Sequence, residues 1–137
     1  MRRISLVLLL SVACSSTNPY RPAVTLDQLS GISFAATTRA PFTVEVQVTN
    51  RHTQPLTVHH MRIEGGLSQQ YRVTPADESV LEVIQPGQTF KIRLVMTAYS
   101  QQGFIQDPEP LNLRAFVSYN VGEQQFRDLY LFRTMIQ

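Results

Sequence analysis

The sequence has one cysteine, no tryptophan and three histidines in 137 residues. A single thiol cannot form an intramolecular disulfide, which excludes a disulfide-stapled scaffold. Catalytic motifs are missing as well: the chain has no Gly-x-Ser-x-Gly elbow, and Gly65-Gly66 lacks the length and the lysine of a phosphate-binding loop. These absences predict a protein without catalytic residues and without a cofactor, and a small-molecule ligand is not expected.

An excess of charge of one sign is also missing. The formal net charge is +2, and removal of Arg2 and Arg3 leaves ten basic and ten acidic residues. The remaining arginines are scattered and form no basic run of the kind that follows a phosphate backbone. We therefore expect no nucleic-acid partner. Apolar residues make up 43% of the chain, which is enough for the packed core of one domain.

The apolar stretch from Ile4 to Val12 is much too short to span a bilayer. Two arginines precede it, and Ala13-Cys14 follows directly. The arrangement resembles the signal peptide and lipobox of bacterial lipoproteins. That resemblance implies cleavage before Cys14 and acylation of its thiol and new amino terminus. The alternatives are an ordinary secretory signal with a chance cysteine, or a buried free thiol.

The residues after the cysteine suggest where the protein resides. By the same resemblance Ser15, which is not Asp, implies sorting to the outer membrane, so the membrane is a partner through the lipid. Residues 15–22 are polar and contain two prolines, as expected of an extended tether. The expected organisation is a signal peptide over 1–13, a lipid-anchored tether over 14–22 and one folded domain over 23–137.

Alternation of apolar and polar residues predicts β-strands over most of this domain. It is clearest from Phe42 to Val48 and recurs from Phe90 to Ala98 and from Leu111 to Val117. Pro86-Gly87 predicts a type II turn, and residues 119–123 predict a hairpin. About seven strands without a sustained helical period predict an all-β fold, an antiparallel immunoglobulin-like β-sandwich.

Three segments carry more specific expectations. A change of phase at His59-His60 predicts a β-bulge or a change of sheet. Residues 25–29 could form a helical turn or the first strand. The last strand, about 125–136, has apolar residues on both faces, among them Leu129 and Leu131, which predicts a central strand or one that is covered on both sides.

A second resemblance concerns the domain itself. The runs Phe42–Asn50, Pro55–Val58 and Ile84–Ile92 are similar to the WHy-type domain of group-2 late-embryogenesis-abundant proteins, in which a strand ends in Asn and a Pro-Gly turn opens a later long strand. The resemblance implies a non-catalytic domain associated with stress tolerance or envelope protection.

Few residues are candidates for a functional site. His52, His59 and His60 could be considered as metal ligands, but adjacent residues on a strand point to opposite faces, so we predict surface histidines and no metal site. The predicted loops 67–78 and 99–110 contain three aromatic residues among Gln and Ser, a composition typical of recognition surfaces. These residues are Tyr71, Tyr99 and Phe104. Alternatively, these aromatics cap the core.

Together these features predict a non-catalytic lipoprotein of the cell envelope, anchored at the outer membrane, whose sandwich acts as a structural module or docks other envelope proteins. A WHy-like protective protein that acts on membranes or client proteins is the alternative.

Overall fold

The computed structural model describes residues 18–34, 37–67, 71–100 and 109–136 of the chain. Within them the chain forms strands joined by turns, and no helix there has the length and hydropathy needed to cross a bilayer. The strands are β1 (Ala23–Gln28), β2 (Arg39–Thr49), β3 (Leu56–Gly65), β4 (Tyr71–Thr74), β5 (Ala76–Ile84), β6 (Thr89–Ser100), β7 (Glu109–Val121) and β8 (Gln124–Ile136).

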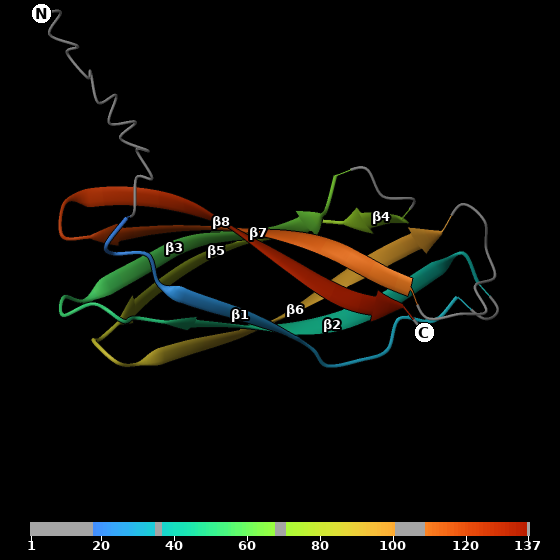
Figure 1. The fold of residues 1–137 in the computed structure, drawn as a ribbon, viewed down its shortest axis with the longest axis horizontal. Helices are drawn as coiled ribbons and strands as arrows, with labels where there is room; N and C mark the ends of the chain where they lie inside the picture. The colour runs from blue at the N-terminus through green and yellow to red at the C-terminus, as the bar shows by residue number, and fades with distance from the viewer. Residues whose placement is uncertain (1–17, 35–36, 68–70, 101–108, 137) are drawn as a thin grey trace, which may run out of the picture.

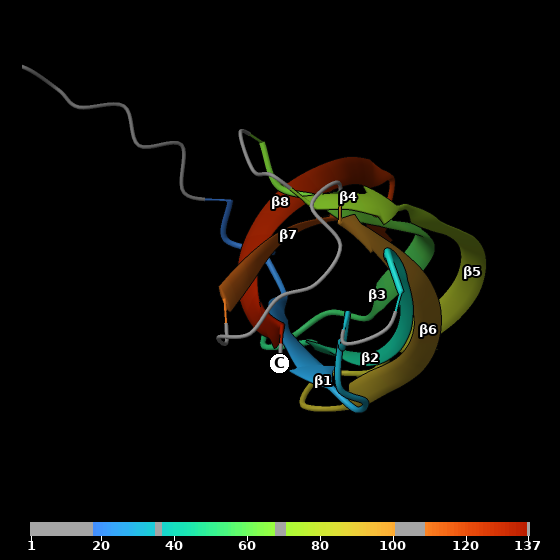
Figure 2. The same cartoon turned by 90° about the vertical axis from the view of Figure 1, so that its right-hand side faces the viewer.

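The strands form two four-stranded antiparallel sheets with the orders β1-β2-β6-β4 and β5-β3-β7-β8 (Figure 1). The first, second and sixth strands share one sheet, and the third, seventh and eighth share the other, as strands A, B, E and C, F, G do in immunoglobulin domains. Seen end-on, the two sheets curve around a common core (Figure 2). The predicted immunoglobulin-like β-sandwich is thus confirmed, with eight strands in the described residues.

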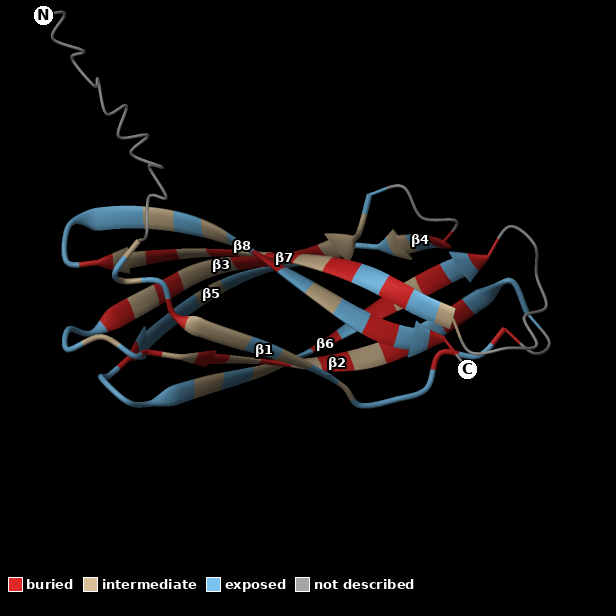
Figure 3. Ribbon diagram, viewed as in Figure 1, coloured by how far each residue is buried: buried red, intermediate tan, exposed pale blue. Residues whose placement is uncertain are grey.

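The core follows the predicted alternation (Figure 3). On β2 every second residue from Phe42 to Val48 is buried, and on β7 every second residue from Leu111 to Val121 is buried. Full burial of one such aliphatic side chain stabilises the fold by about 1.5–3 kcal/mol. The faces expected for these strands are therefore correct.

Tight turns connect the strands at one end of the sandwich. Gly87 and Gly122 have φ values of 78° and 59°, which residues with a Cβ rarely adopt. Buried Asn50 ties two turns together, because its Nδ2 donates to the Ile84 carbonyl at 2.9 Å and to the Gln54 carbonyl at 2.7 Å. The predicted turn at Pro86-Gly87 and the hairpin before β8 are both present.

The register of β3 shifts between Val58 and His60, which is the predicted bulge. Residues 25–28 belong to β1 and not to a helical turn. The expectation of one loop over residues 67–78 is wrong, since it contains β4 and the start of β5.

The position predicted for the last strand is also wrong. β8 is an edge strand, and Leu131 on its outer face is 73% exposed. Apolar residues on both faces of a strand favour cover on both sides, but the outer residues of β8 are exposed to solvent. This outer face is a candidate contact surface.

Candidate functional site

The segment in front of β1 lies against the ends of β7 and β8. Asn18 Nδ2 donates to the Tyr119 hydroxyl at 2.5 Å and to Asp128 Oδ2 at 3.3 Å, while Asn18 Oδ1 accepts from the Tyr20 amide at 2.9 Å. Tyr119 in turn donates to Asp128 at 2.5 Å. Burial, together with the Asp128 carboxylate, raises the pKa of Tyr119 above its usual value. The hydroxyl therefore remains a proton donor at neutral pH.

Arg21 strengthens this attachment along the free edge of β8. Its Nη2 donates to the Leu129 carbonyl at 2.8 Å, and its guanidinium carbon lies 4.2 Å from the centre of the Tyr130 ring. The Tyr130 hydroxyl donates to the Pro22 carbonyl at 2.7 Å, and burial raises the pKa of that hydroxyl. Residues 18–22, part of the expected tether, are thus held on the sandwich.

This attachment limits how far the domain can stand from Cys14, which lies outside the described residues. Only four peptide steps separate Cys14 from Asn18. At full extension they span about 14 Å. The α-carbon of Cys14 can therefore lie no farther than about 14 Å from that of Asn18.

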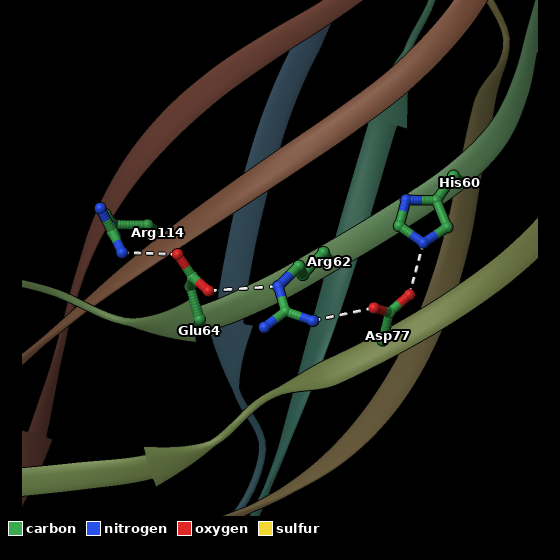
Figure 4. A network of polar contacts seen from close by, with 5 residues as sticks. All are labelled: His60, Arg62, Glu64, Asp77 and Arg114. Carbon is green, nitrogen blue, oxygen red and sulfur yellow. Dashed lines mark hydrogen bonds and ion pairs between the residues drawn. The ribbon is translucent and has the colours of Figure 1, made fainter.

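A network of charged side chains crosses the outer face of the second sheet (Figure 4). Arg62 Nη1 lies 2.8 Å from Asp77 Oδ2 and its Nε lies 3.2 Å from Glu64 Oε2, and Arg114 Nη2 lies 2.5 Å from Glu64 Oε1. His60 Nε2 forms a hydrogen bond with Asp77 Oδ1. The hydrogen bonds from His60 and Arg62 hold the pKa of Asp77 below its usual value. The network therefore joins β5, β3 and β7, which are neighbouring strands of the second sheet.

The three histidines have separate partners. His59 Nε2 lies 2.9 Å from Asn120 Oδ1 on β7, and His60 Nε2 forms its hydrogen bond with Asp77 on β5. His52 lies in a turn, where its ring centre is 4.5 Å from that of Tyr20. In the part of the chain that the structure describes, no three His, Cys, Asp or Glu side chains are grouped so that they could hold a metal ion.

The aromatic residues predicted for recognition loops lie in different settings. Tyr71 is buried in β4, where its ring stacks on Phe34 at 5.9 Å and its hydroxyl donates to Glu109. Tyr99 is on β6, partly exposed, with the Arg39 guanidinium 6.0 Å from its ring centre. Phe104 lies outside the described residues. A binding role for these residues stays a prediction. Tyr71 packs at the margin of the core, as the alternative interpretation expects.

The structure also reveals a surface that the sequence reasoning missed. Leu67 and Leu131, 74% and 73% exposed, flank a groove of about 490 Å³ on the outer face of the second sheet. Arg114 and Arg133 also line the groove. The pairing of β7 with β8 brings these residues together, so the only sequence signal was the outward phase of Leu129 and Leu131.

No family model matches the sequence, and no curated protein matches it. The resemblance to the WHy-type domain therefore gains no support beyond the sandwich itself.

Solved structures do share the fold. A Bordetella pertussis protein given the name ApaA has a TM-score of 0.62 and 14% identity, over 86% of this chain and 94% of its own. A Northeast Structural Genomics Consortium target reaches 0.56 with 11% identity, over 85% of this chain and 86% of its own. A FixG-related protein from Vibrio parahaemolyticus reaches 0.50 with 9% identity, over 85% of this chain and 97% of its own. At these identities the likeness shows the fold alone.

Proposed function

We propose that this protein is a non-catalytic lipoprotein of the bacterial envelope, anchored at the outer membrane through acylated Cys14, whose β-sandwich docks other envelope proteins. The observation that carries the proposal is the position of Cys14. It follows a charged start and a short apolar stretch directly, and it precedes by four positions Asn18, the first described residue, whose side chain bonds to the sandwich.

The chemistry of the chain supports this function over the alternatives. The only thiol of the chain has no disulfide partner within it, and several acyl chains at roughly 0.8 kcal/mol per buried CH₂ would hold the protein at a bilayer. On the outer face of the second sheet, the network that runs from Asp77 to Arg114 joins three neighbouring strands, which suits a preformed surface for a partner. No sequence motif supplies a nucleophile with its base.

Incorporation of a labelled fatty acid tests the anchor. The wild-type protein is expected to incorporate the label, to partition with membranes and to resist extraction by high salt. Cys14→Ala should lose the label and keep its leader, while Ser16→Ala, two positions along, should behave as wild type. Recovery of soluble wild-type protein with an unmodified Cys14 would contradict the proposal.

Affinity capture from solubilised membranes tests the docking role. A specific envelope protein should be recovered with the wild-type lipoprotein in repeated captures. A deletion strain separates docking from the protective alternative: loss of a defined envelope machine supports docking. Normal machinery combined with poor survival of drying would favour the WHy-like role.

A further inference from the structure

The outer side of β8 combines basic and apolar side chains without an acidic one. Alternate residues of the strand face outward, because the residues between them face the core or its margin. The outward residues are Gln125, Arg127, Leu129, Leu131, Arg133 and Met135. Three of them are large apolar side chains that are exposed to solvent: Leu131 at 73%, and Leu129 and Met135 at 41% each.

Strand β7 extends this surface. Residues directly opposite each other on paired strands share a face, and Phe116 lies opposite Leu129 while Arg114 lies opposite Leu131. The Arg127 guanidinium carbon is 4.6 Å from the centre of the Phe116 ring. Together with Leu67 across the groove, these residues form what we call the β8 surface.

The opposite edge of the same sheet has a different character. β5 exposes Asp77, Glu78 and Glu82 together with Leu81, which is 83% exposed. The charges are therefore unevenly distributed across this sheet. Arg127 and Arg133 lie on β8 and the three carboxylates on β5, while β3 between them carries the paired Arg62 and Glu64. An anionic surface would be attracted to β8 and repelled from β5.

We infer that the β8 surface rests on the anionic face of the bilayer, with its arginines at lipid phosphates and its leucines at the boundary of the acyl chains. Exposed leucines between arginines suit such an interface, because apolar burial and attraction to anionic headgroups add together. Continuity with the anchor favours a lipid over a protein occupant. Arg21 bonds the Leu129 carbonyl, and Cys14 lies within about 14 Å of Asn18 at that end of the strand.

This orientation rests on the proposed lipid anchor, but it is tested separately from it. A fluorophore sensitive to polarity is attached to Leu131→Cys or to Leu81→Cys in the full lipoprotein, reconstituted in vesicles that contain phosphatidylglycerol and quencher-bearing lipids. Leu81 is the matched control, because it is also a largely exposed leucine, on the other edge of the sheet. Wild-type protein treated in parallel gives the baseline from Cys14, and the mass of its N-terminal peptide reports acylation.

We expect the label at position 131, and not at position 81, to shift to the blue and to be quenched by the lipids. The double substitution Arg127→Gln with Arg133→Gln should shift the equilibrium toward the free orientation. The equilibrium constant for contact with the bilayer should fall by about fivefold for each arginine. The charge-matched pair Lys91→Gln with Arg93→Gln, exposed on the first sheet, should change it little.

Other outcomes overturn the inference. Labels at both positions in water, or both equally quenched, would mean that the β8 surface has no preferred contact with the bilayer. A label at 131 that is shielded only in native membranes would assign the surface to a protein partner. An acylated N-terminus with position 131 in water rejects the orientation alone, whereas quenching at 131 without acylation rejects the anchor alone.

Discussion

The side-chain amide of Gln28 forms two hydrogen bonds with the backbone of Met135, so that the last residue of β1 takes the place of a strand next to β8. Gln28 Nε2 donates to the Met135 carbonyl at 3.1 Å, and the Met135 amide donates to Gln28 Oε1 at 3.2 Å. Unpaired backbone groups on an edge strand invite pairing with another chain. This contact therefore protects the end of β8 and links the two sheets.

Replacement of Gln28 should expose that edge. Gln28→Ala is expected to lower the free energy of unfolding by about 1 kcal/mol, as for a solvent-accessible hydrogen-bonded side chain, and to promote self-association at high protein concentration. Light scattering coupled to gel filtration would detect the association. Gln125→Ala, exposed near the other end of β8, is the control and should remain unchanged. Equal behaviour of the two variants would contradict a protective role for Gln28.

The hydroxyl of Tyr119 should stabilise the docked segment in front of β1. Tyr119→Phe removes the partner of Asn18 and leaves Asp128 with fewer donors, so we expect a loss of about 1–3 kcal/mol in denaturant unfolding. Tyr99→Phe is the control, because that hydroxyl is partly exposed and lies 3.4 Å from Thr74. A similar loss in both variants would argue against a special role of the buried hydroxyl.

The same hydroxyl predicts a decline of stability at alkaline pH. The pKa of Tyr119 is raised in the folded state, so the unfolded chain loses this proton first. The contribution is fully present below the ordinary value of about 10 and is lost as the pH rises from there toward the folded pKa. Unfolding measured between about pH 9 and 11 should show a shallower decline for Tyr119→Phe than for wild type.

Sequence and structure agree where a strand has one buried face. Val44 and Val46 alternate with polar residues, and that period alone defined β2 and its core side. The predicted turn at Gly87 and the predicted bulge at His60 were also correct, because a positive φ and a β-bulge each leave a local signal in the sequence.

Disagreement arises where position depends on distant strands. The same pattern in β8 suits a central strand or an edge strand, since pairing partners are not encoded locally. The β8 surface was missed for that reason: Arg114 and Leu131 are opposite each other only because β7 pairs with β8 in this register. Asn18 could not be placed from its polar neighbours, because its partner Tyr119 lies 101 positions away.

The network of charges on the second sheet should lose part of its stabilising effect at acidic pH. The pKa of Asp77 is lowered in the fold by its hydrogen bonds to His60 and Arg62, so its stabilising effect is present above its ordinary value of about 3.9 and is lost as the pH falls below it. Asp77→Asn should therefore flatten the fall in melting temperature between about pH 5 and 3. Glu78→Gln, a carboxylate outside the network, should leave that slope as in wild type.

Val46→Asp should unfold the domain. Val46 is fully buried on β2 between the two sheets, at the centre of the alternation that defined this strand. An unpaired carboxylate placed there costs several kcal/mol, against a total stability of about 5–15 kcal/mol for a domain of this kind. The matched control is Glu45→Gln, one residue away on the outer side, where Glu45 Oε2 lies 3.2 Å from Arg93 Nε. The Arg93 side chain is exposed, and an ion pair with a solvent-exposed partner contributes little, so this variant should melt near the wild-type temperature. Circular dichroism during heating compares the two, and equal melting temperatures would mean that the faces of β2 are assigned the wrong way round.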